Sequence, residues 1–229
     1  MNRLIFKIIA AATMVIDHIG VIFLETDTLA YSILRIIGRI SFVLFAYMIA
    51  EGFHKTKDIN KYLLRLGLSA LVLEVFIIIY FLFSGDNLIL SFNILWTLFF
   101  GLLSLYLFFH RNPYLKILLV FIVLGSELIG FSYGAYGVLM IAFFGIYQNK
   151  VTNMLHLIFL NLLFIDQPLL AFMNYQEYAK FPVIQWFSLA AVIFIFLYNA
   201  KPGRYKLKWF FYTFYPGHLL ILYLIKLLI

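Results

Sequence analysis

Long apolar stretches separated by short polar ones make up nearly the whole chain. A helix that crosses a bilayer needs about 20 predominantly apolar residues, so each long apolar stretch predicts one spanning helix. Dividing the chain at its polar positions gives nine segments: residues 3–24, 31–53, 62–83, 88–109, 114–131, 134–148, 153–173, 183–199 and 209–229. The pattern therefore predicts an all-α fold, a polytopic transmembrane helix bundle with about nine spans. The fifth and sixth segments are short and meet at Gly130–Gly134.

The composition excludes a water-soluble globule. The 229 residues are 65% hydrophobic and 12% charged, whereas soluble domains carry about 25% charged residues. So few charges cannot cover a surface that faces water. The sequence has no cysteine, which excludes disulfides and thiolate metal sites. No long polar insert or obvious repeat interrupts the segments, so we expect residues 1–229 to form a single integral-membrane domain.

The basic residues follow the positive-inside rule, by which loops rich in Lys and Arg stay in the cytoplasm. Nearly all of them fall at one set of alternate segment ends: Arg3, Lys7, Lys55, Lys57, Lys61, Arg65, Arg111, Lys116, Lys150, Lys201, Arg204, Lys206 and Lys208. The other loops hold acidic residues and one lysine, Lys180. This asymmetry predicts a cytoplasmic N-terminus and an outer C-terminus. It also accounts for the net charge of +7 without nucleic acid binding.

Four polar residues of the first two segments are predicted to meet inside the membrane. Asp17 and His18 lie in the outer half of the first segment, and Arg35 and Arg39 lie in the outer part of the second, which runs in the opposite direction. Arg35 and Arg39 share one helix face because they are four residues apart. Buried charges are costly and usually face a partner or a wet cavity.

Two interpretations of this cluster stay open. An ion pair between Asp17 and an arginine would only fix helix packing. Alternatively, two guanidinium groups for one carboxylate leave a spare positive charge beside the His18 imidazole. That arrangement suits binding or polarising an anionic or carbonyl group, with His18 as acid or base.

Weaker candidates lie elsewhere. His218 follows Pro216 near the middle of the last segment and is equally compatible with a structural and a functional role. No two histidines share an i, i+4 ligand spacing, so no metal site is predicted. Glu51 lies near the end of the second segment on the predicted cytoplasmic side, and His54 and Lys55 follow that segment. Basic residues there and around Lys201 suit anionic lipid headgroups or a phosphorylated cofactor such as coenzyme A.

The sequence resembles the TraX family of membrane proteins. The resemblance rests on five stretches in unchanged order: KIIAAATMVIDHIGVIF and RIIGRISFVLFAYMIAEGF in the first two segments, KYLLRL, NILWTLFFGLLSLYL, and the end FLYNAKPGRYKLKWFFYTFYPGHLLILYLI. The family takes its name from a conjugative-pilus protein that acetylates the N-terminus of pilin. It is similar to polytopic acyltransferases that move acetyl groups from cytoplasmic acetyl-CoA onto exported or envelope acceptors.

Several residues match the family's motifs directly. They are the Asp-His pair Asp17 and His18, the second-segment residues Arg35, Gly38 and Arg39, the Glu-Gly pair Glu51 and Gly52, the Tyr-Asn pair Tyr198 and Asn199, and the Tyr-Pro-x-His residues Tyr215, Pro216 and His218. The chain departs from the family at three positions. Val43 replaces a usual Pro, Lys55 stands where His is frequent, and Ala200 stands where Gly is favoured.

The resemblance implies a membrane-embedded acyltransferase that moves an acetyl group from acetyl-CoA to a hydroxyl or amine. We expect His18, oriented by Asp17, to remove the acceptor's proton, with Arg35 or Arg39 stabilising the oxyanion and His218 as rival base or second proton carrier. The implied cofactor-binding residues are Glu51, His54, Lys55, Asn199, Lys201 and Tyr215.

The implied location is a bacterial cytoplasmic membrane, crossed several times, with bilayer lipids as neighbours. The acceptor stays open among a peptide N-terminus, a glycan and a lipid. The alternative function is a transporter of small anions or lipids that uses the Asp, His and Arg residues as a relay. A structural subunit of a membrane complex is a third interpretation.

Overall fold

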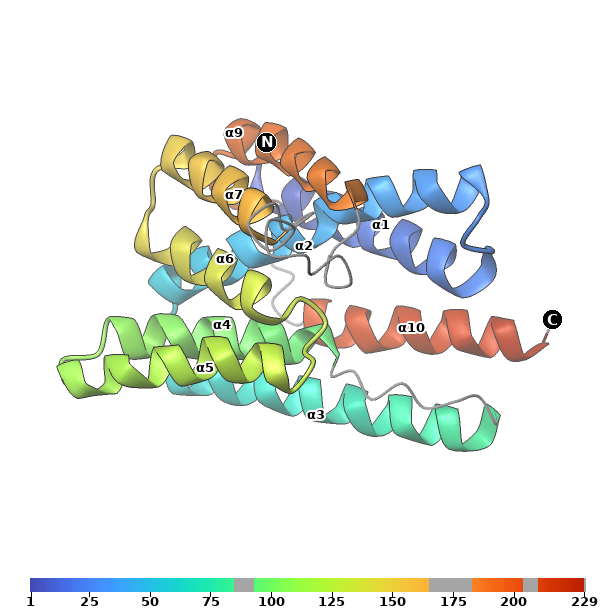
Figure 1. The fold of residues 1–229 in the computed structure, drawn as a ribbon, viewed down its shortest axis with the longest axis horizontal. Coiled ribbons are helices and arrows are strands. Elements are labelled where there is room, and N and C mark those ends of the chain that lie inside the picture. Colours follow the sequence, from blue (N-terminus) through green and yellow to red (C-terminus); the bar gives the residue numbers. More distant parts are fainter. Residues whose placement is uncertain (85–92, 165–182, 204–209, 229) are drawn as a thin grey trace, which may run out of the picture. The chain divides into compact units, whose positions relative to one another are not determined.

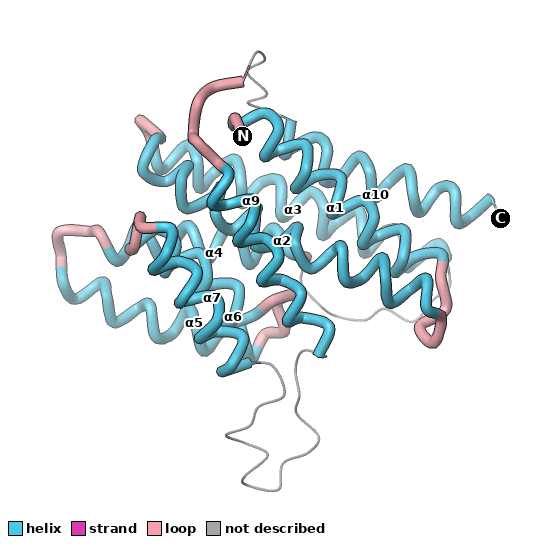
Figure 2. The backbone as a smooth tube through the Cα atoms, turned by 90° about the horizontal axis from the view of Figure 1, so that it is seen from above, coloured by secondary structure: helices cyan, strands magenta, loops and turns pink. Residues whose placement is uncertain are grey.

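The computed structural model describes residues 1–84, 93–164, 183–203 and 210–228. These residues form nine α-helices and two 3-10 helices, joined by loops (Figures 1 and 2). The α-helices are α1 (Arg3–Phe23), α2 (Leu29–Lys55), α3 (Ile59–Ser84), α4 (Ile94–Phe108), α5 (Ile117–Leu128), α6 (Gly134–Ile146), α7 (Lys150–Phe164), α9 (Ala191–Leu197) and α10 (Phe210–Leu228). The 3-10 helices are η1 (Pro113–Lys116) and η2 (Val183–Ala190). The predicted helical bundle of about nine helices is confirmed.

Three helices are long and apolar enough to cross a membrane: Arg3–Phe23, Leu29–Lys55 and Ile59–Phe83. The other apolar helices in the described part of the chain are shorter. The protein is therefore a membrane protein, as its composition predicts. Residues 88–92, 165–173, 209 and 229 of the predicted spans lie outside the described residues, as do Lys180, Arg204, Lys206 and Lys208. The orientation of the termini stays a prediction.

The helices form two compact units, which we describe separately. One unit contains residues 1–45 and 149–229, and the other contains residues 46–148. Helix α2 contributes residues to both units. That residues 1–229 form one integral-membrane domain stays a prediction.

In the unit of residues 46–148, helix α4 packs against α3, α5 and α6 (Figure 1). The predicted junction at Gly130–Gly134 is a tight turn between α5 and α6. Gly130 and Gly134 both have positive φ angles, 81° and 44°, which only glycine adopts at little cost. The Glu127 carboxylate accepts a hydrogen bond from the Ala135 backbone N–H at 3.2 Å and so closes the turn.

A second carboxylate in this unit is also a hydrogen-bond acceptor for backbone and amide groups. Glu74 of α3 accepts from the backbone N–H of Asn93 at 3.1 Å and from its side-chain amide at 2.6 Å. The Asn93 amide also donates to the Ala70 carbonyl at 2.9 Å, and its oxygen caps the start of α4. Glu74 and Asn93 therefore connect α3 to the beginning of α4.

In the other unit, the start of α1 is bound to the chain that follows α9. The N-terminal ammonium donates to the Leu197 carbonyl at 2.6 Å, and the Arg3 backbone N–H donates to the Lys201 carbonyl at 2.9 Å. The Asn199 side-chain oxygen accepts from the Lys201 N–H at 3.1 Å, which shapes the turn between them. Helix α10 packs along α1, and α7 packs against η2 and α9.

Ala200 lies in this turn with a φ angle of 59°. A left-handed backbone costs a residue with a Cβ atom roughly 1–2 kcal/mol, whereas glycine adopts it freely. The preference for glycine at this position, which the family resemblance implies, therefore has a conformational cause.

Candidate active site

An Asp–Arg–Arg cluster connects α1 to α2. An Asp17 carboxylate oxygen accepts from Arg35 Nη1 at 2.6 Å, and the carboxylate also accepts from Arg39 Nη2 at 3.0 and 3.3 Å. Arg35 and Arg39 approach the same carboxylate because they lie one turn apart on one face of α2. The predicted meeting of Asp17 with Arg35 and Arg39 is what the structure shows. Removing one partner of such a pair leaves an uncompensated charge, which costs about 3–5 kcal/mol.

The two arginines differ in how fully their donors are used. Arg39 is 5% exposed, and it also donates from Nε to the Arg35 carbonyl at 3.2 Å and from Nη1 to the Gln185 side-chain oxygen at 3.1 Å. The Arg35 side chain is 20% exposed. Its Nε and Nη2 groups make no hydrogen bond to any residue that the structure describes, and its guanidinium lies 5.9 Å from the centre of the Tyr31 ring. Arg35 therefore has donors left for a ligand.

Gly38 makes the cluster sterically possible. It lies on α2 between the two arginines, where a Cβ atom would overlap the Asp17 side chain. Only glycine leaves room for the carboxylate to enter between α1 and α2 at this level. The match of Gly38 to the family motif thus has a steric reason.

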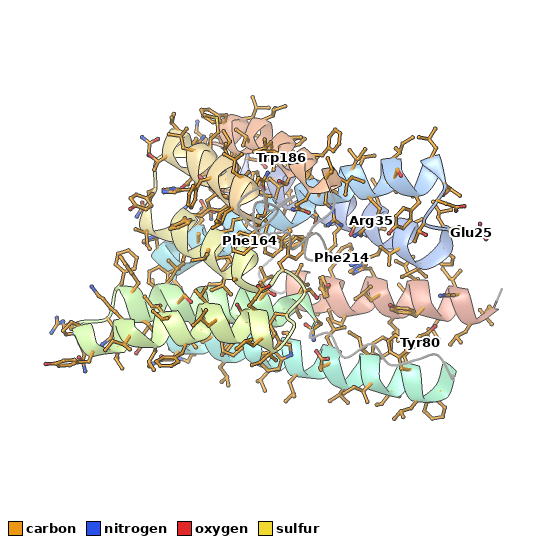
Figure 3. All side chains as sticks on the ribbon, viewed as in Figure 1. Glu25, Arg35, Tyr80, Phe164, Trp186 and Phe214 are labelled. Carbon is orange, nitrogen blue, oxygen red and sulfur yellow. The ribbon has the colours of Figure 1, made fainter. Side chains whose placement is uncertain are left out.

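Two histidines from opposite ends of the sequence form a hydrogen-bonded pair. His18 Nδ1 and His218 Nε2 are 2.7 Å apart, and the two rings stack with centroids separated by 4.9 Å. His218 Nδ1 donates to the Phe214 carbonyl at 2.8 Å, one turn earlier in α10. The Tyr215 ring meets both imidazoles edge-on, at centroid distances of 6.0 and 5.4 Å. Figure 3 labels Arg35 on α2 and Phe214 on α10.

His18 has a different partner from the one expected. Consecutive residues of an α-helix point about 100° apart, so Asp17 and His18 leave α1 in different directions. The Asp17 carboxylate bonds the guanidinium groups, while the His18 imidazole bonds His218. Within the described residues, His218 rather than Asp17 orients the His18 ring.

The predicted cofactor-binding residues divide into three groups. Tyr215 lies at the histidine pair. Asn199 and Lys201 lie near Arg3 at the other end of α1, which is about 22 Å from His18 at 1.5 Å of rise per residue. The remaining three belong to the unit of residues 46–148.

In that unit, the predicted residues have partners of their own. Lys55 forms an ion pair with Glu51 one turn earlier in α2. His54 lies with Nε2 at 2.7 Å from the Gly145 carbonyl, to which it donates. The His54 hydrogen bond connects the end of α2 to the end of α6.

Gln185 belongs to the site but was not predicted from the sequence. Its side chain is fully buried, and it joins η2 to the cluster through Arg39. The available signal was a polar amide within the apolar run 183–197, where an unpaired polar group is costly.

The fold and site define a helical membrane protein with a carboxylate–guanidinium cluster and a histidine pair, to which α1 contributes the adjacent residues Asp17 and His18. The TraX protein family model matches residues 2–226, and the chain belongs to the TraX family. It is similar to the "Probable fimbrial assembly protein FimC, serogroup H1" of Dichelobacter nodosus, with 28% identity over 94% of this chain and 92% of that protein. No solved structure matches the chain.

The Gly38→Ala substitution should separate α1 from α2 at the cluster. Overpacking costs about 1–3 kcal/mol, and loss of the ion pairs adds to this, so we expect a clearly lower midpoint of thermal unfolding in detergent. Gly217→Ala in α10 is the matched control, because a Cβ atom there meets nothing within 4 Å. Equal unfolding midpoints for the two variants would contradict the steric role of Gly38.

Proposed function

We propose that this TraX-family protein is a membrane-embedded acyltransferase that moves an acetyl group from acetyl-CoA to a hydroxyl or amine acceptor. The observation that carries the proposal is a hydrogen-bonded imidazole pair at His18, the residue next to Asp17, whose partner Arg35 keeps donors that no described residue uses. Imidazole is the usual group for moving protons near neutral pH. A guanidinium in a poorly hydrated site stabilises a developing oxyanion strongly.

Each group has a definite part in this chemistry. Acetyl-CoA supplies a thioester carbonyl carbon, to which the acceptor oxygen or nitrogen bonds, and a thiolate that leaves as the carbon–sulfur bond breaks. The imidazole pair removes the acceptor's proton and returns it to the leaving sulfur. Arg35 donates to the carbonyl oxygen while that oxygen carries negative charge. Arg39 and Gln185 hold Asp17 and α2 in place.

The charge of the cluster favours this step. Two guanidinium groups and one carboxylate leave one net positive charge beside His18. The negative charge on the carbonyl oxygen appears as the proton reaches the imidazole, so the site as a whole gains no net charge. In a low-dielectric site such compensation is worth more than in water.

Donor, acceptor and location are parts of the same proposal. Lys201 lies on the side of α1 that the charge pattern assigns to the cytoplasm, where it suits the phosphate groups of coenzyme A. Glu51, His54 and Lys55 are proposed for the same donor. The fimbrial assembly role in the name of the Dichelobacter nodosus relative supports an exported acceptor. The candidate acceptors are a peptide N-terminus, a glycan and a lipid. The proposed location of the protein is the bacterial cytoplasmic membrane, which it crosses several times.

The test is acetyl transfer by the purified protein. With acetyl-CoA labelled in the acetyl group, we expect turnover to water or to added amine by the wild type. His18→Ala should lose about 100-fold or more, the usual contribution of a positioned base. His110→Gln is the control, because His110 follows α4 and its ring contacts the local residues Tyr106 and Asn112. Unchanged turnover in His18→Ala would contradict the assignment, and absent transfer by folded wild type would favour the transporter alternative.

The two arginines should separate in their effects. Arg35→Gln removes an oxyanion donor, so we expect kcat to fall about 100-fold. Arg39→Gln breaks the more buried ion pair and the bond to Gln185, so the unfolding midpoint should fall more in this variant than in Arg35→Gln. Measuring kcat and the unfolding midpoint for both variants tests whether Arg35 acts mainly in catalysis and Arg39 mainly in stability. Equal losses of kcat with equal unfolding midpoints would contradict these separate roles.

A further inference from the structure

The hydrogen bonds of the histidine pair fix where its protons lie. A backbone carbonyl only accepts, so the 2.8 Å contact with Phe214 requires a proton on His218 Nδ1. In a neutral imidazole the other nitrogen then carries a lone pair, and His218 Nε2 must accept. The 2.7 Å contact with His18 Nδ1 therefore requires a proton on that atom. What remains is His18 Nε2, which carries the lone pair.

We infer that His18 Nε2 is the atom that takes the acceptor's proton, and that His218 is a positioning residue that sets the tautomer of His18. The inference rests on the proposed acyl transfer and decides between the two histidines. Both nitrogens of His218 are engaged within the protein, and the residue is only 7% exposed. His18 is half-buried, and its Nε2 makes no hydrogen bond to any described residue.

The tautomer is a real constraint on His18. A neutral imidazole has one nitrogen with a free lone pair. Without His218, that nitrogen of His18 could be Nδ1 instead of Nε2, and Nε2 could then not accept a proton. A carbonyl or carboxylate that bonds one ring nitrogen selects the chemistry of the other in the same way elsewhere. Here the Phe214 carbonyl of α10 sets the tautomer of His218, and His218 in turn sets the tautomer of His18 in α1.

The same chain of bonds provides for the positive charge. When His18 Nε2 takes a proton, its Nδ1–H bond to His218 Nε2 strengthens because the donor is now charged. The charge stays on His18, and His18 Nε2 then passes its proton to the leaving sulfur. Every proton that enters the pair leaves it at the same atom.

Nitrogen NMR of the histidine-labelled full chain in detergent shows directly which ring nitrogens of His18 and His218 carry protons. At a pH where both rings are neutral, we expect His18 and His218 both to carry the proton on Nδ1, which is the less common tautomer in water. The signals are assigned by their loss in His18→Asn and His218→Gln. A neutral His18 with its proton on Nε2 would overturn the inference.

Conservative variants give a second readout. The amide oxygen of His218→Gln can replace Nε2 as acceptor, so acetyl transfer should stay within several-fold of wild type. His218→Phe keeps a ring but no acceptor, so kcat should fall at least 10-fold with little change in KM. His18→Asn keeps a donor at the Nδ1 position but no base, so it should lose about 100-fold or more. Equal losses in His218→Gln and His18→Asn would show that His218 itself carries the proton of the acceptor.

These experiments separate the two proposals. Wild-type protein with the expected tautomers and no acetyl transfer would contradict the acyltransferase, and with it a base role for His18, while the proton arrangement stands. Acetyl transfer with the proton of neutral His18 on Nε2 would contradict only the present inference.

Discussion

The Asp17 carboxylate is the constraint on which the site depends. Two arginines of α2 share it, and in a membrane-embedded bundle neither charge can be left without a counter-ion at small cost. The sharing fixes the height and rotation of α1 against α2. It also requires a glycine where the carboxylate passes between the helices. Because His18 is the next residue of α1, the position of its imidazole follows from the same contact.

The arginines and histidines around Asp17 differ in how many of their polar atoms are bonded within the protein. Arg39 is buried and also donates to Gln185, whereas Arg35 is half-buried and keeps donors that make no hydrogen bond to a described residue. The histidines divide in the same way. His218 is held by its own helix, and His18 Nε2 makes no hydrogen bond within the described part of the chain. Each functional group thus has a partner that positions it, as preorganised sites require.

The sequence alone predicted the helical bundle, because long apolar segments admit few other structures in a membrane. It also predicted the meeting of Asp17 with the arginines, since depth and an i, i+4 spacing are local properties. It did not predict the bond between His18 and His218, because residues 200 positions apart are brought together only by helix packing. Gln185 was missed for the same reason. The turn at Ala200 needed the observed φ angle before its glycine preference could be explained.

Cross-linking tests the central claim that α1 and α10 bring the two histidines into contact. The chain contains no cysteine, so a His18→Cys, His218→Cys double variant can be treated in membranes with a short thiol cross-linker and analysed by mass spectrometry. We expect an efficient link between positions 18 and 218. We expect none in a His18→Cys, Lys201→Cys control, because Lys201 lies at Arg3, about 22 Å from His18 along α1. A missing 18–218 link, or equal linking in the control, would contradict the account.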